Sequence, residues 1–228
     1  MQYAGTILDR LVAPEFSTLT PFSLPDVPDL PNYYGSFFLN NIFRSEYEDK
    51  SRPIIFSMLR HLNQSVKDYQ GGKKKLAEFG NVKRNSNEAV AIYLRALTHF
   101  EQAIIHCDLA AGLSHGVARI FDNTTPKEHF GSGENLAEER LRFLSNAIKH
   151  FDRTVLAGKL PNNAAPVWIV TEGLRCVFET KKGGPPIVKT LDFREMAHIL
   201  AELTINAKFL AEDVYRLALE RRAVKNSV

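Results

Sequence analysis

Residues 87 to 120 read NEAVAIYLRALTHFEQAIIHCDLAAGLSHGVARI, and apolar side chains recur along this stretch at helical spacing. One narrow stripe consists mostly of small residues: Ala89, Ile92, Ala96, Ala103, Cys107, Ala110 and Val117. This spacing is typical of an α-helix, and small side chains let a neighbouring helix approach closely. The stretch therefore predicts a long helix packed closely against another, weakened in its last turns by Gly112 and Gly116.

Two helical runs precede this stretch. Residues 35 to 50 favour a helix that breaks at Ser51-Arg52-Pro53, because proline disfavours helix in the residue before it and suits a first helical turn. A second helix is expected from Pro53 to about Tyr69, where Gly71-Gly72 should end it. The apolar side of this second helix consists of Ile55, Leu59, Leu62, Val66 and Tyr69.

Another helix is predicted after the central stretch, from about Glu134 to Leu156. Residues 122 to 133 before it and residues 158 to 166 after it are rich in turn-forming residues, which predicts loops. Apolar residues in this helix alternate in steps of four and three, which indicates a side that faces the core. They are Ala137, Leu141, Leu144, Ile148, Phe151 and Val155.

The pattern then changes to that of a small sheet. VWIVTEGLRCVF at residues 167 to 178 is rich in β-branched and aromatic residues around a central glycine, which predicts a hairpin. IVKTL at residues 187 to 191 suits a third short strand. Asp192 and Glu195 have the spacing of a capping box for a last helix that ends near Arg222. The core-facing side of that helix consists of Met196, Leu200, Leu203, Ala207, Leu210, Val214 and Leu217.

The N-terminal region, residues 1 to 35, is expected to be an extended arm, because each proline fixes φ and removes a backbone donor. The prolines are Pro14, Pro21, Pro25, Pro28 and Pro31. The apolar residues between them are Phe16, Leu19, Phe22, Leu24, Val27 and Leu30. A solvated linker is rarely so apolar, so the arm should pack on the body, residues 36 to 228, or on a partner subunit.

These elements together define the expected fold class. The chain is predicted to be mainly α, an antiparallel bundle of four to five long helices. A small β-hairpin insertion, at about residues 167 to 191, is expected before the last helix.

Composition sets mild limits on location and function. The formal net charge of +3 permits contact with nucleic acid without arguing for it, since nucleic-acid binders concentrate charge on one surface. The basic run Lys73-Lys74-Lys75 indicates a solvated loop, with a phosphate contact as the less favoured alternative.

Cys107 and Cys176 form no CxxC pair. With no leader pattern and no apolar run near the ~20 residues of a membrane span, a cytoplasmic location without membrane contact is expected.

The candidate chemistry lies in RLRFLSNAIKHFDR, residues 140 to 153. At about 100° per residue, the side of this helix opposite the apolar stripe carries Arg142, Asn146, Lys149, His150 and Arg153. An imidazole that titrates near neutral pH can transfer protons beside a phosphate, and guanidinium groups bind phosphate oxygens in a fork. A polar stripe is also what any bundle helix presents to water, and this structural interpretation stays beside the functional one.

The run SNAIKHFDR, residues 145 to 153, resembles the Arg-Asn-x-x-x-His motif of HEPN domains. These are small α-helical domains, usually dimeric, and many cut RNA as toxins or defence proteins. The resemblance covers most of residues 36 to 222. It implies a homodimer that acts in an RNA- or nucleotide-linked process, as a metal-independent endoribonuclease or as a non-cutting relative of one. RNA and a cognate protein are the partners that this family implies.

The resemblance also implies roles for individual residues. His150 matches the catalytic histidine and Asn146 the polar residue of the motif. Ser145 stands where the motif has arginine, so Arg142 is expected to stabilise the developing charge, although it lies about 12 Å from His150 along the axis. Ser145, Lys149 and Arg153 are expected to contact the substrate.

A second function stays open, that of a non-catalytic, homodimeric helical interaction module. An RNA enzyme should gather its basic side chains in a concave groove, whereas an interaction module should expose an apolar patch. No metal or cofactor is expected. His99 and His106 lie seven residues apart rather than three or four, and the single Glu195-x-x-His198 has no second copy.

Overall fold

A computed structural model describes residues 9, 13, 15–20, 23–41, 47, 50–84, 86–122, 136–151, 156, 165–179 and 186–213. Its helices are α2 (Tyr33–Asn41), α3 (Ser51–Phe79), α4 (Asn87–Asp122), α6 (Ala137–Lys149), α8 (Phe193–Lys208) and the π-helix η1 (Phe209–Asp213). Its strands are β1 (Trp168–Ile169), β2 (Gly173–Glu179) and β3 (Pro186–Asp192). The predicted fold class, mainly α with a small β insertion before the last helix, is confirmed.

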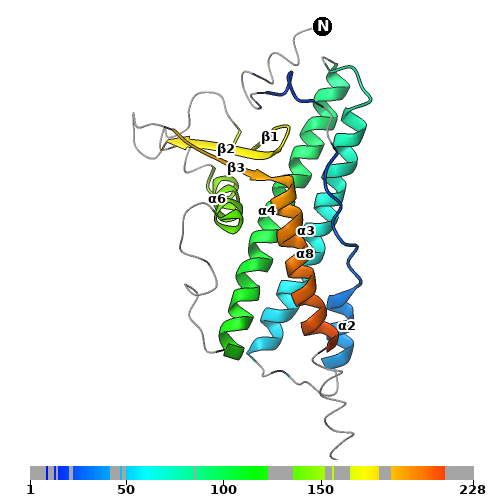
Figure 1. Cartoon of the computed structure of the whole chain (residues 1–228), viewed down its shortest axis with the longest axis vertical. Helices are drawn as coiled ribbons and strands as arrows, with labels where there is room; N and C mark the ends of the chain where they lie inside the picture. The colour runs from blue at the N-terminus through cyan, green and yellow to red at the C-terminus, as the bar shows by residue number, and fades with distance from the viewer. Residues whose placement is uncertain are drawn as a thin grey trace, which may run out of the picture.

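The long helices α3 and α4 form the centre of the molecule. Figure 1 shows them side by side, with α8 along them and α2 beside the far end of α8. The sheet and α6 lie together on the other side of α4. Because α6 is seen nearly end-on in this view, it crosses the direction of the long helices rather than running along them. The bundle is therefore built on one long helical hairpin.

The small-residue stripe of the central stretch is confirmed as the buried side of α4. All seven of its residues are buried, and Ala89, Ala96, Ala103, Cys107 and Ala110 are fully so. The close approach extends to polar groups, because the Ser65 hydroxyl on α3 donates to the Ala103 carbonyl oxygen on α4 at 2.8 Å. The buried Ser65 hydroxyl therefore has a hydrogen-bond partner inside the interface between the two helices.

The prediction that Gly71-Gly72 ends the second helix is wrong, because α3 continues to Phe79. A Cβ placed on Gly71 would lie 2.9 Å from His99, and one placed on Gly72 would lie 2.7 Å from the Phe100 ring. The glycines therefore let α4 pack against α3, and tertiary packing outweighs their poor helix propensity.

The same continuation corrects the interpretation of the lysine run as a loop. Lys73, Lys74 and Lys75 lie on α3. Lys73 pairs with Asp26 of the arm, and Lys75 pairs with Glu78 at 2.6 Å. Two of the three charges are thus used within the molecule.

Alanine substitution of two helical glycines should have opposite effects on stability. Gly72→Ala should lower the free energy of unfolding by about 1 kcal/mol, because overpacking against Phe100 exceeds the gain in helix propensity. Gly112→Ala should raise it by about 0.5–1 kcal/mol, because a Cβ there has no neighbour within 4 Å. Urea unfolding measures both, and equal stabilisation by the two substitutions would contradict the close approach at Gly72.

The β insertion forms as predicted. The strands make an antiparallel sheet in the order β1-β2-β3, with Ile169 opposite Leu174 and Leu174 opposite Leu191. The sheet is attached to α4, because the Ile169 amide donates to the Tyr93 hydroxyl oxygen at 3.0 Å. The predicted capping box is also present, with Asp192 accepting from the Arg194 amide and Glu195 accepting from the Asp192 amide.

The N-terminal arm packs on the helical body. Phe16, Leu19, Leu24 and Val27 are buried, and Figure 1 shows this segment running along α3. The Tyr69 hydroxyl donates to the Pro25 carbonyl oxygen at 3.0 Å. Gln70 donates to Asp29 at 2.9 Å, and Arg175 of β2 pairs with Glu15. The arm is thus held by apolar burial and by polar contacts to α3 and the sheet.

Other predictions fall partly outside the described residues. On α8 and η1, the predicted stripe is buried at Met196, Leu200, Leu203, Ala207 and Leu210. Val214, Leu217 and Arg222 lie outside the described residues, as do Phe22, Val155 and residues 123–133. α2 covers part of the helix predicted over residues 35 to 50.

Candidate functional site

The helix that carries the predicted site is α6. Its buried residues are Leu141, Leu144 and Ser145. Glu138 and Glu139 lie in its first turn and Lys149 in its last. These charges interact favourably with the helix dipole and stabilise the helix. α6 is shorter than predicted. It ends at Lys149, and His150 has non-helical backbone angles, with φ −116° and ψ 21°. The apolar periodicity of the sequence does not predict this break.

Three predicted site residues are exposed along α6 and its end: Arg142, Asn146 and His150. The His150 amide donates to the Asn146 carbonyl oxygen at 3.0 Å, which ties the two backbones together. Arg142 precedes Asn146 by one helical turn, so the three residues follow one edge of the helix. Arg153 lies outside the described residues.

Two other predicted residues, Ser145 and Lys149, contact α4. Ser145 is fully buried, and its hydroxyl donates to Asp108 Oδ2 on α4 at 2.8 Å. Lys149 Nζ donates to the same oxygen at 2.9 Å. The expectation that Ser145 meets a substrate is therefore corrected: its hydroxyl binds α4, because position 145 belongs to the buried side of α6.

A further contact holds α6 at its other end. The Arg140 guanidinium on α6 pairs with the Glu195 carboxylate on α8. Glu195 also accepts from the Asp192 amide, so one carboxylate serves the helix cap and the contact to α6. With Asp108 at one end and Glu195 at the other, α6 is fixed relative to the long helices.

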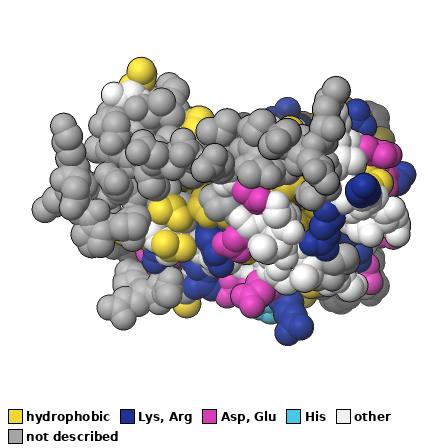
Figure 2. Space-filling model, turned by 90° about the horizontal axis from the view of Figure 1, so that it is seen from above, with side chains coloured by type: hydrophobic (Ala, Val, Ile, Leu, Met, Phe, Trp, Pro, Cys, Tyr) yellow, Lys and Arg dark blue, Asp and Glu magenta, His cyan; other side chains and the backbone are white. Residues whose placement is uncertain are grey.

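Charge is mixed on the end of the molecule seen in Figure 2. Among the described side chains there, Lys and Arg lie between Asp and Glu, with apolar and uncharged groups beside them. A nucleic-acid groove is usually marked by charge of one sign. The described side chains at this end therefore do not form a surface of one charge.

The structure brings together a second group of candidate residues that the sequence did not reveal. A cavity of about 570 Å³ opens where α2, α3 and α4 meet. It is lined by Tyr34, Phe56, Arg60, His61, Asn63, Gln64, Lys67 and His106. Most of these residues lie on the outer side of α3. The apolar periodicity of the sequence predicts only that this side is exposed to solvent.

Two histidines form the inner wall of this cavity. His61 Nδ1 on α3 and His106 Nδ1 on α4 lie 2.9 Å apart, and the rings are stacked with centroids 5.1 Å apart. Such a contact needs one proton, so one ring donates and the other accepts. Burial lowers the pKa of both imidazoles. The neighbouring His106 and Arg60 lower the pKa of His61 further, whereas at His106 the Asp68 carboxylate opposes the lowering and Arg60 adds to it. The neutral form of the pair is thus favoured.

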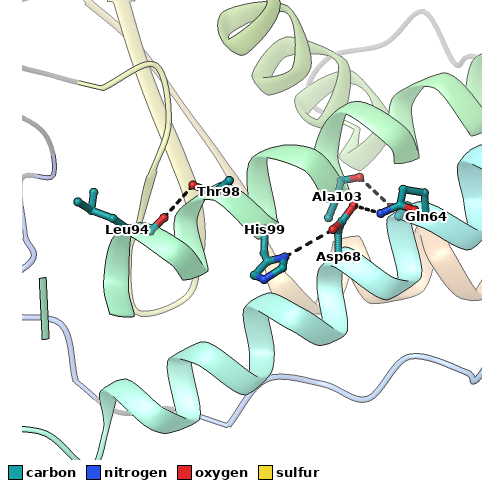
Figure 3. A network of polar contacts seen from close by, with 7 residues as sticks. Gln64, Asp68, Leu94, Thr98, His99 and Ala103 are labelled. Carbon is teal, nitrogen blue, oxygen red and sulfur yellow. Dashed lines mark hydrogen bonds and ion pairs between the residues drawn. The ribbon is translucent and has the colours of Figure 1, made fainter. Parts of the chain in front are cut away.

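A polar network lies beside the histidine pair. Gln64 Nε2 donates to Asp68 Oδ2 at 2.9 Å, and Asp68 Oδ1 lies 3.5 Å from His99 Nδ1 (Figure 3). Asp68 is therefore directed toward Gln64 and His99. His99 and His106, considered together in the sequence, have different partners in the fold.

No metal centre is evident in the described part of the chain. It contains no group of three or more His, Cys, Asp or Glu side chains placed to hold an ion. Glu195 is used in the cap, and His198 lies 3.3 Å from Glu202 on the exposed side of α8.

Glu101 on α4 is a further titratable group that the sequence did not mark. Burial raises its pKa to about 7. It lies seven residues before Asp108, hence on nearly the same side of α4.

Of the helices in the described residues, none has the length and apolar character needed to span a membrane. The resemblance to HEPN domains is neither supported nor opposed by a relative. Comparison of the chain with family models, with curated proteins and with solved structures gives no match.

Proposed function

We propose that the protein acts in an RNA-linked process as a HEPN-like protein, with Arg142, Asn146 and His150 as the side chains that meet the RNA. The observation that carries the proposal is their joint exposure on α6 while Ser145 and Arg140 hold that helix to α4 and α8. Polar groups on a fixed helix keep their spacing, which binding and catalysis both require.

Cleavage would need Arg142. Ser145 faces Asp108 in the interior, so the position that carries arginine in the HEPN motif points away from solvent in this chain. Arg142 is the exposed arginine one turn before Asn146. In this proposal His150 moves the proton of the ribose 2′-hydroxyl, and Arg142 stabilises the charge on the phosphate. A chain in which Arg142 cannot reach the phosphate would bind RNA without cutting it.

The test is cleavage and binding of end-labelled structured RNA by the purified protein in EDTA. His150→Ala and Arg142→Ala should each slow cutting by about 100-fold or more, the loss typical of a general acid–base group or a charge-stabilising donor. Arg194→Ala, which removes an exposed arginine on α8, is the matched control and should change neither rate nor affinity.

The outcomes separate the alternatives. Binding by wild type that Arg142→Ala weakens, without any cutting, would identify a non-cutting relative. Cutting that survives His150→Ala would exclude the proposed site. Absence of both binding and cutting would reject the RNA-linked function.

A second candidate function, a homodimeric interaction module, is favoured by exposed apolar side chains at one end of the molecule. They are Phe38 and Leu39 on α2, Ile205 on α8 and Phe209 on η1. α2 and η1 are in contact, since Asn40 Nδ2 donates to the Ala211 carbonyl oxygen at 2.9 Å. Apolar groups gathered at one end are typical of protein contacts. A stable dimer mass for the same preparation, without RNA binding, would support this function.

A further inference from the structure

The cavity between α2, α3 and α4 has a basic side formed by Arg60 and Lys67. Arg60 and Lys67 are exposed, and neither forms an ion pair or hydrogen bond within the described residues. Seven residues separate them on α3, so they share one side of the helix about 10.5 Å apart. Long flexible side chains at that spacing can close on one anion between them. A concave site with unpaired cations attracts negative charge.

The other side of the cavity is aromatic. The Tyr34 and Phe56 rings meet edge to face, with centroids 6.4 Å apart, and the Phe56 side chain is 37% exposed. Exposed rings that line a cavity offer a surface on which a flat ligand ring can stack. Asn63 lies between Phe56 and Lys67 in the lining and adds an amide that can donate or accept.

We propose that this cavity binds a small phosphomonoester that carries an aromatic ring system. The phosphate lies between Arg60 and Lys67, beside the His61–His106 pair, and the ring packs on Tyr34 and Phe56. The volume of about 570 Å³ suits a ligand of this size.

The cavity is separate from the α6 site. His106 lines it, whereas Asp108, two residues later on α4, holds α6. Two helical steps turn a side chain by about 200°, so the two residues point to opposite sides of α4. This proposal therefore does not depend on the function assigned to α6.

Binding should be linked to proton uptake. If both rings of the His61–His106 pair were imidazolium, two N–H groups would face each other at 2.9 Å, so the pair resists full protonation. A phosphate beside the pair stabilises an imidazolium by accepting a hydrogen bond from it. The charged groups around the pair are Arg60, Lys67 and Asp68 from α3, which together carry a net positive charge, and Tyr34 is the titratable group from α2.

The direction of the pH dependence follows from these contacts. The pKa of each imidazole is lowered in the free protein and rises when the anion binds. Affinity therefore increases as the pH falls from 8 towards 6. Below about 6 the gain levels off, because the phosphomonoester itself takes up a proton.

Calorimetric titration with adenosine 5′-monophosphate tests the site, with adenosine and inorganic phosphate as partial probes. The monophosphate should bind more tightly than either partial probe. Arg60→Ala and Lys67→Ala should each weaken it by about 10-fold or more, as expected for a charge-assisted contact. Arg95→Ala, which removes an exposed arginine on α4 away from the cavity lining, should have no effect.

A second measurement addresses the histidine pair. Titrations at pH 8 and pH 6, in two buffers that differ in ionisation enthalpy, should show proton uptake with wild type and a smaller uptake with His106→Gln, in which His61 alone remains. Urea midpoints near that of wild type verify that the variants fold.

Three results would overturn the proposal. The first is no binding of the monophosphate at millimolar concentration. The second is binding that neither Arg60→Ala nor Lys67→Ala weakens. The third is adenosine binding as tightly as the monophosphate, which would show that the basic side of the cavity takes no part.

Discussion

Replacing Phe16 with alanine should lower the free energy of unfolding by about 3–5 kcal/mol, the usual cost of removing a fully buried phenyl ring. Phe16 has no exposed surface. Its ring centroid lies 5.6 Å from that of Phe79 on α3 and 5.1 Å from that of Tyr93 on α4, the latter edge to face. The substitution therefore removes a side chain that bridges both long helices, and these large rings cannot collapse into the space without losing their own contacts.

Urea unfolding of Phe16→Ala beside Phe38→Ala gives a matched comparison. Phe38 on α2 is 56% exposed, so its truncation should change stability by less than about 1 kcal/mol. A loss below about 1 kcal/mol for Phe16→Ala as well would contradict a structural role for the arm. The expected large loss would show that this proline-rich segment completes the core.

Features that depend on one element could be predicted from the sequence. The α4 stripe was predictable because burial repeats with the helical period, and a run of small residues indicates a close neighbour without naming it. The capping box at Asp192 and Glu195 was predictable because both hydrogen bonds lie within four residues. The apolar character of the arm likewise indicated contact with the body.

Features that depend on two elements could not be predicted in the same way. Gly71 and Gly72 are end signals in isolation, and only the position of His99 and Phe100 on α4 makes them interior helical residues. His61 and His106 are 45 residues apart in the chain. Their contact requires the register of α3 against α4, which periodicity does not give.

The candidate site on α6 has features that the sequence predicts and one that it does not. The helical period correctly placed Arg142 and Asn146 on the exposed side. It did not show that position 145 turns inward, because Ser145 is polar and breaks the apolar pattern while its hydroxyl is satisfied by Asp108. A buried serine paired with a carboxylate on another helix looks, in sequence, like a surface residue.

Gly173→Ala should lower the free energy of unfolding by about 3 kcal/mol, at or above the upper end of ordinary overpacking. A Cβ at this position would lie 2.0 Å from the Leu191 carbonyl oxygen, and a backbone atom in a paired strand cannot turn away as a side chain can. Gly173 also closes the turn between β1 and β2, since its carbonyl oxygen accepts from the Val170 amide at 2.9 Å. Separating β2 from β3 would therefore disturb the turn as well as the ladder.

The effect should be strongest in the sheet. Amide hydrogen exchange of Ile169 and Leu174 should speed up more in Gly173→Ala than exchange of α4 amides, because α3 and α4 keep their own contacts. Gly112→Ala, an addition of the same methyl group with no neighbour within 4 Å, should leave both sets unchanged or more protected. Since α6 contacts β3, a loosened sheet should also weaken the RNA binding proposed at Arg142 and Asn146. A Gly173→Ala protein as stable as wild type would mean that β2 and β3 pair less closely at this position than the 2.0 Å approach requires.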